Sequence, residues 1–182
     1  MTNRRILVAA VILALAGLAG SFAAGRMLAD GSGAAAASTV ESGTVEVPLR
    51  APAIEGSDPL AGGTVSLARV KKLVVLTVWA SWCGPCARGA DALRDFARRH
   101  RDDVAVIGLD LQDEPTDARA FYERHGWTFP SIRDADGAFA AALGVGDLPT
   151  TFFIGRGRLI QARLDGPASR DDLEAALAEA RG

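Results

Sequence analysis

An apolar segment that ends close to two cysteines constrains the fold of this chain more than any other feature. Residues 73–79 are almost entirely apolar and rich in β-branched side chains, as is typical of a central strand buried on both faces. From Cys86 to His100, apolar residues recur at helical spacing. Cys83 and Cys86, the only two cysteines, lie where the strand gives way to the helix. The sequence therefore predicts a strand–turn–helix unit with both thiols near the start of the helix.

Strands and helices alternate along the rest of the chain. The patterns predict strands over 45–49, 64–67, 104–110, 129–132, 150–154 and 159–164, and helices from Pro115, over 136–143 and from Ser169 to about Arg181. Pro115 suits the first turn of its helix, and Ser169 with Asp172 has the spacing of a helix cap. This order predicts an α/β fold, with a central mixed β-sheet flanked by helices and preceded by an N-terminal strand pair.

The N-terminus has the composition of a membrane-targeting signal. Two arginines precede residues 6–25, which carry no charge and are strongly apolar in their first half. Such a segment is typical of an export signal, and about 20 apolar residues also suffice to span a bilayer as a helix. Two outcomes stay open: cleavage near Ala23, which would release a secreted protein, or retention of 6–25 as an anchor in the cytoplasmic membrane, which we slightly prefer. In either case this hydrophobic helix is expected outside the fold.

Composition divides the chain into three parts. Residues 1–25 are the signal peptide or anchor, 26–44 are rich in Gly, Ala and Ser and predict a flexible linker, and 45–182 form one folded domain. The chain has 20 basic and 22 acidic residues, a balance that argues against a nucleic-acid partner because such proteins concentrate basic side chains on one surface. Export would place the domain in an oxidising compartment, where disulfide chemistry is normal.

The position of the two cysteines predicts their chemistry. Free N–H groups and the helix dipole stabilise an anion at a helix N-terminus, so a thiolate there has its pKa lowered from ~8.5 to about 3.5–7.5. Cys83, at the helix start, is the expected attacking thiolate. Cys86, one turn further, is the expected resolving thiol and should be the more buried of the two. Disulfide exchange would then pass through a mixed disulfide, in either direction.

Other uses of a cysteine pair stay open at this point. A structural disulfide would use the same two residues, but their position in a tight strand-to-helix turn favours disulfide exchange over a purely structural cross-link. A metal site would need further ligands, and His100 and His125 lie far from the cysteines in sequence, near helix ends. Two thiolates suit copper(I), so a copper-binding or metallochaperone module is the alternative of another class. We expect no metal and no cofactor besides the Cys83–Cys86 disulfide.

Three segments carry a resemblance to a known family. They are Val78–Cys86 (VWASWCGPC), residues 129–137 with FPSI and DADG, and Gly144–Ile154 (GVGDLPTTFFI). From about Val45 onward the chain resembles the thioredoxin superfamily and, more narrowly, the exported TlpA/ResA-like (DsbE-like) thiol–disulfide oxidoreductases. The resemblance implies a thioredoxin-like fold and an enzyme that exchanges disulfides with protein substrates through catalytic Cys83 and Cys86.

The resemblance also implies roles for residues around the cysteines. In the family, the proline of the Leu-Pro-Thr segment, here Pro149, is cis and lies against the cysteine pair. The backbone at Leu148 would pair with an extended substrate as an added strand. Trp82 would flank the thiolate as an apolar contact surface, and Gly84 and Pro85 would separate the two cysteines.

Three positions depart from the family's pattern. Thioredoxins place a buried Asp where this chain has Thr77, and many TlpA/ResA-like proteins place a Glu where it has Gly89. Relatives often have a Pro at the position of Asp91, which we expect to face the surface rather than to replace the missing acid. The usual proton-transfer carboxylate is therefore absent, and without a substitute the Cys86 thiol should lose its proton more slowly.

These observations together predict an extracytoplasmic thiol–disulfide oxidoreductase. The Gly-Pro dipeptide between the cysteines moderately favours a reductase, with an oxidase of secreted proteins as the alternative direction. In relatives the substrates are often apocytochrome c or copper-site cysteines, and a membrane partner feeds electrons, so a role in cytochrome c maturation is one option. A thiol peroxidase is disfavoured because Ala80 occupies the position where those relatives have Thr. We expect a monomer whose partners are protein thiols and a membrane electron donor or acceptor.

Overall fold

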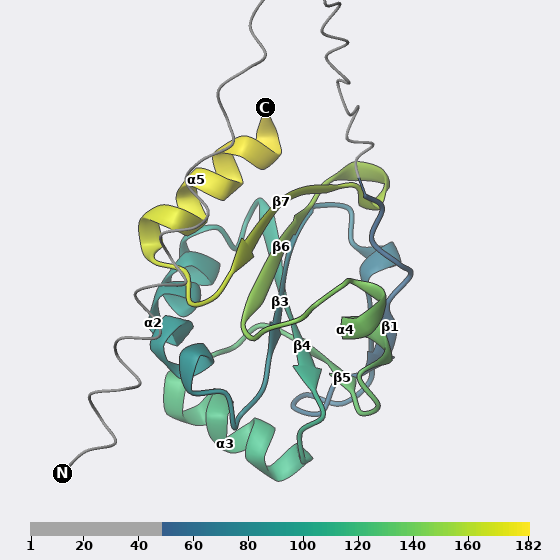
Figure 1. Ribbon diagram of the computed structural model, residues 1–182, viewed down its shortest axis with the longest axis vertical. Helices are drawn as coiled ribbons and strands as arrows, with labels where there is room; N and C mark the ends of the chain where they lie inside the picture. Colours follow the sequence, from purple (N-terminus) through teal and green to yellow (C-terminus); the bar gives the residue numbers. More distant parts are fainter. Residues whose placement is uncertain (1–48) are drawn as a thin grey trace, which may run out of the picture. The chain divides into compact units, whose positions relative to one another are not determined.

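The computed structural model describes residues 49–182 (Figure 1). The expected signal or anchor at 1–25, the linker at 26–44 and nearly all of the strand expected at 45–49 lie outside the described residues. Between residues 49 and 182, no helix is long and apolar enough to cross a membrane.

A five-stranded mixed sheet forms the centre of the fold, in the order β5-β4-β3-β6-β7. Its strands are β3 Leu73–Trp79, β4 Val104–Leu111, β5 Ser131–Asp134, β6 Thr150–Ile154 and β7 Ile160–Asp165. The first three of these run parallel, whereas β6 pairs antiparallel with both β3 and β7. Six of the seven residues of β3 are buried, which confirms the central strand predicted from its apolar run.

Helices cover both faces of the sheet, as Figure 1 shows. The helices are α2 Gly84–Arg99, α3 Pro115–His125, α4 Ala138–Ala142 and α5 Arg170–Arg181. Alternate side chains of β3 enter two separate cores: Val75 and Trp79 pack with residues of α2, α3 and α5, while Leu76 and Val78 pack with α4 and the segment before β3. The α/β class with a mixed sheet flanked by helices is therefore confirmed.

Several element boundaries differ from those predicted. The short strand β2, Thr64–Ser66, pairs antiparallel with β1, Glu55–Ser57, which the sequence patterns did not predict. Leu49, the one described residue of the strand expected at 45–49, is not in a strand, and the neighbouring Arg50 forms only an isolated bridge with Leu159. Helix α2 begins at Gly84 rather than Cys86, because glycine and proline are tolerated in a first turn whose N–H groups have no helical partner.

Residues near Asp134 explain two further shifts. Strand β5 begins at Ser131 rather than at residue 129, since Pro130 precedes it and has no N–H to donate to a neighbouring strand. Helix α4 begins at Ala138, after a turn in which Gly137 has a φ of 76°. The carboxylate of Asp134 accepts hydrogen bonds from two N–H groups in the first turn of α4, at 3.2 and 2.8 Å.

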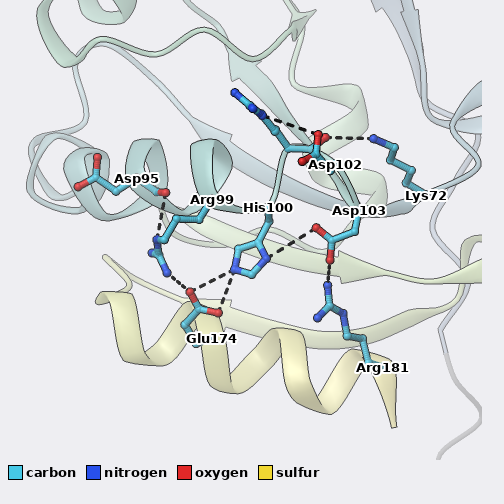
Figure 2. A network of polar contacts seen from close by, with 9 residues as sticks. Lys72, Asp95, Arg99, His100, Asp102, Asp103, Glu174 and Arg181 are labelled. Carbon is cyan, nitrogen blue, oxygen red and sulfur yellow. Dashed lines mark hydrogen bonds and ion pairs between the residues drawn. The ribbon is translucent and has the colours of Figure 1, made fainter.

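Polar contacts tie α5 to the end of α2, as Figure 2 shows. The cap predicted for α5 is present as a reciprocal capping box between Ser169 and Asp172. At the far end of α2, His100 Nε2 lies 3.0 Å from a carboxylate oxygen of Glu174 on α5, and Arg99 also contacts Glu174. His100 is thus a half-buried helix-end residue that joins two helices, far along α2 from the cysteines.

Candidate active site

Cys83 and Cys86 form a disulfide at the N-terminus of α2, with their Cα atoms 5.2 Å apart. Cys83 is the N-cap residue of the helix, and its Sγ accepts a hydrogen bond from the Cys86 N–H at 3.0 Å. Gly84 and Pro85 fill the first two helical positions. The donor and the helix dipole both point at the Cys83 sulfur, so they would stabilise a thiolate there after reduction.

The two sulfurs differ little in burial in this oxidised form. Cys83 is 5% exposed and Cys86 is 3% exposed, so the larger burial expected for Cys86 is present only as a small difference. The neighbouring Trp82 is 62% exposed and is one of two large hydrophobic side chains that lie open to solvent in the described part of the chain. An apolar ring therefore flanks the disulfide on the surface.

A small cavity adjoins Cys86 on the inner side of the site. About 20 Å³ of it is open to water, enough for roughly one molecule. Cys86, Gly89 and Pro149 line it, together with the side chains of Thr77 and Thr151. The Leu148–Pro149 peptide bond is cis, as the family resemblance implied, and the Pro149 carbonyl accepts a hydrogen bond from Gly166 N–H at 2.8 Å.

The three departures from the family pattern are all visible at this cavity or close to it. Thr77 is buried, and its hydroxyl accepts a hydrogen bond from the Thr151 hydroxyl at 3.2 Å. Gly89 contributes no side chain to the cavity wall. Asp91 is mostly exposed and forms an ion pair with Arg94 at 2.7 Å, which confirms that it faces the surface. Among the described residues, no carboxylate lines the cavity beside Cys86.

Two buried acids close to the site were missed from the sequence. Asp113 accepts hydrogen bonds from the Ser81 backbone N–H at 2.5 Å and from the Ser81 hydroxyl at 2.6 Å, two residues before Cys83. Asp110 is completely buried in β4, and its burial, reinforced by the neighbouring Asp113 carboxylate, raises its pKa to about 8. The sequence offered one signal for them, because both acids lie at or just after the end of a strand predicted to be buried. Parallel strands end at the same edge of a sheet, so such acids lie near the loop that follows the neighbouring strand.

Metal-ligand side chains do not gather elsewhere in the described residues. Across 49–182, no three His, Cys, Asp or Glu side chains lie together in a way that could hold a metal ion. His100 and His125 end α2 and α3, respectively, and neither lines the cavity beside Cys86.

A C-x-x-C disulfide at a strand-to-helix junction of such a sheet belongs to the thiol–disulfide oxidoreductases of thioredoxin-like fold. Comparison with known proteins agrees with this class. Residues 47–163 match the AhpC/TSA family, and the chain belongs to that family.

Two relatives and one solved structure show more closely which proteins this chain resembles. The thiol–disulfide oxidoreductase ResA of Geobacillus thermodenitrificans is 29% identical over 104 residues, which is 57% of this chain and 60% of the ResA chain. The thioredoxin-like protein YneN of Bacillus subtilis is 30% identical over 122 residues, 65% of this chain and 71% of YneN. The crystal structure of a DsbF homologue from Corynebacterium diphtheriae superposes with a TM-score of 0.64 at 32% identity, over 71% of this chain and 86% of that one.

Proposed function

We propose that this protein is an extracytoplasmic thiol–disulfide oxidoreductase that exchanges disulfides with protein substrates through Cys83 and Cys86. The observation that carries the proposal is the disulfide at the N-terminus of α2, with the Cys86 N–H donating to the Cys83 sulfur. That donor and the helix dipole favour negative charge on Cys83, which is what an attacking or a departing thiolate requires.

The exchange follows from this arrangement. In the reduced protein, the Cys83 thiolate attacks a substrate disulfide, forms a mixed disulfide and releases one substrate thiolate. Cys86 loses its proton and attacks the Cys83 sulfur, which releases the second substrate thiolate and leaves the Cys83–Cys86 disulfide. Two electrons pass to the substrate, and a dithiol donor must restore the reduced pair. The same steps in reverse would oxidise a substrate dithiol.

Substrate contacts are assigned to the surface around the disulfide. Trp82 would offer an apolar contact next to Cys83, consistent with its exposure. Leu148, which precedes the cis Pro149, would pair its backbone with an extended substrate segment as an added strand. Gly84 and Pro85 would leave room for the substrate sulfur to approach, because neither adds a long side chain at the start of α2.

The physiological setting belongs to the same proposal. We place the protein outside the cytoplasm, held by residues 6–25 or released after cleavage near Ala23, as a monomer. The similarity to ResA supports the oxidoreductase, and the Gly-Pro dipeptide favours the reducing direction. We assign the protein as a reductase fed by a membrane electron donor, with cytochrome c maturation as one such role. Oxidation of secreted proteins is the opposite direction of the same chemistry. Copper binding has less support, since among residues 49–182 the two thiolates are the only soft ligands at this site.

The reduction potential of the Cys83–Cys86 pair tests this proposal. The protein would be equilibrated with glutathione or dithiothreitol buffers of known ratio, and the fraction of disulfide would be measured. A value near about −270 mV would support the reductase, and one near about −120 mV would reverse the direction. Cys86→Ser should trap a mixed disulfide with a substrate protein, whereas Cys83→Ser should not. A pair that never exchanges with either buffer would refute the oxidoreductase.

A further inference from the structure

Two buried acids, Asp110 near the end of β4 and Asp113 just after this strand, lie beside the active-site loop, and Asp113 is hydrogen-bonded to it. In the register of the sheet, Asp110 of β4 lies opposite Trp79, the last residue of β3, so both strands end at the edge where the cysteine loop begins (Figure 1). Three residues beyond Asp110, both carboxylate oxygens of Asp113 accept hydrogen bonds from Ser81. The Cys83 N–H donates to the Ala80 carbonyl at 3.2 Å, so Ser81 lies inside the turn that ends at Cys83.

Asp113 therefore holds the loop through a charge-assisted contact. Its side chain is buried, and each of its two carboxylate oxygens accepts one hydrogen bond from Ser81, which fixes the loop relative to the end of β4. The guanidinium of Arg133 on β5 also donates to the Asp113 backbone carbonyl at 3.4 Å, which holds the segment after β4 against β5.

Asp110 differs from its acidic neighbours in having no such partners. Neither of its carboxyl oxygens has a hydrogen-bond partner among residues 49–182. Burial raises the pKa of Asp110, and the neighbouring Asp113 and Asp134 raise it further. The positive charge of Arg133 lowers this pKa, but by less than the other groups raise it. From α3, the hydroxyl of Tyr122 is buried nearby, and burial raises its pKa, so it stays neutral.

The acid pair thus has one stable arrangement near neutral pH. Asp113 accepts two hydrogen bonds from Ser81, while Asp110 keeps its proton because burial, together with the neighbouring carboxyl groups, raises its pKa to about 8. Removal of the Asp110 proton would place an extra negative charge under the loop that carries Cys83.

We propose that Asp110 and Asp113 are positioning residues that couple the disulfide exchange of Cys83 to a proton held on Asp110. This inference rests on the proposed oxidoreductase function. Reduction creates a thiolate on Cys83, and this negative charge makes it harder for Asp110 to ionise. Asp110 therefore binds its proton more tightly in the reduced protein than in the oxidised one. Asp110 thus has a higher pKa in the reduced protein than in the oxidised one. At a pH between these two values, reduction is accompanied by the uptake of a fraction of a proton at Asp110, in addition to the protons that the two thiols bind.

The pH dependence of the reduction potential tests the coupling. The full-length protein, Asp110→Asn and a control, Asp91→Asn, would each be measured from about pH 6 to about pH 10. Asp91 is a suitable control because it is an exposed acid of α2 that pairs with Arg94. The wild type and the control should show a steeper dependence on pH above about pH 8 than Asp110→Asn does. Superimposable curves for all three proteins would overturn the coupling.

A second measurement needs no variant, in case Asp110→Asn does not fold. The infrared spectrum of the wild type should contain a protonated carboxyl band at neutral pH, and its titration midpoint should rise on reduction. An absent band, or equal midpoints in the two redox states, would refute the proposal. Failure of the wild-type pair to exchange with thiol buffers would instead refute the oxidoreductase function, so the two failures are distinguishable.

Discussion

Of the glycines between residues 49 and 182, Gly108 leaves the least room for a Cβ atom, and its replacement by alanine gives a sharp test of the structure. A Cβ atom on Gly108 would lie 2.6 Å from Ser131 Oγ, 2.7 Å from Trp79 Nε1 and 2.9 Å from the Tyr122 hydroxyl. All three residues are buried. The serine hydroxyl can rotate away, but the indole and phenol rings cannot move without displacing the aromatic side chains packed around them.

The expected cost of Gly108→Ala follows from these contacts. Inserting one carbon into a well-packed core costs about 1–3 kcal/mol. Moving the Trp79 indole or the Ser131 hydroxyl also breaks their 3.4 Å hydrogen bond, and an unpaired buried polar group costs about 1–3 kcal/mol more. We therefore expect a loss of about 2–6 kcal/mol, a large part of the roughly 5–15 kcal/mol that stabilises a typical domain.

Gly89→Ala is the matched control with the opposite expected sign. Its Cβ would meet Pro167 at 3.4 Å, an ordinary contact distance. Alanine is favoured over glycine inside a helix by about 0.5–1 kcal/mol, so this variant should be slightly more stable than the wild type. Both variants would be unfolded in urea with the disulfide intact and followed by tryptophan fluorescence. A Gly108→Ala protein within about 0.5 kcal/mol of the wild type would show that the packing around Trp79 is wrong.

Three further predictions concern single groups. Thr77→Val should destabilise the protein by about 1–3 kcal/mol in a urea titration, because it leaves the buried Thr151 hydroxyl without its partner, and an unchanged midpoint would contradict that bond. Ser169→Ala should cost about 1 kcal/mol through loss of the α5 cap, and Arg170→Ala, just inside the same helix, should cost less. Asp110 has a folded pKa of about 8, above its unfolded value, so its contribution to stability is complete below about pH 4 and is lost as pH rises through about 8. Denaturation curves measured across this pH range should therefore show a smaller decline in stability for Asp110→Asn than for the wild type. An equal decline in both proteins would refute this prediction.

The parts of the fold that sequence predicts well are those in which local pattern and tertiary environment agree. The β3 run is apolar because both faces of the strand are buried, so its bounds were predicted correctly at Leu73 and Trp79. The α5 cap depends on two residues three positions apart, and both were identified. By contrast, β1 has the sequence Glu-Gly-Ser, which lacks a strand pattern and forms a strand only through its pairing with β2.

The candidate site divides in the same way. The two cysteines and Pro149 lie in contiguous motifs, and the resemblance implied that Pro149 lies against the cysteine pair; Cys86 and Pro149 line the same cavity. The contact between Asp113 and Ser81 joins residues 32 positions apart, and it exists only because β3 and β4 are parallel neighbours in a particular register. No local pattern encodes that register, so the contact between Asp113 and Ser81 became visible only in the structure.

The position of Asp110 means that this buried acid should affect the two steps of the proposed exchange differently. A carboxylate at the positions of Thr77 or Gly89 would line the cavity beside Cys86 and could accept that thiol's proton directly. Asp110 does not line that cavity, and it is linked to the site through Asp113 and the loop that precedes Cys83. The acid pair should therefore change the charge environment of Cys83, the attacking sulfur, while the proton of the Cys86 thiol passes to solvent. On this reasoning, Asp110→Asn alters how the first exchange step depends on pH, whereas Gly89→Glu accelerates the second step, the release of the mixed disulfide.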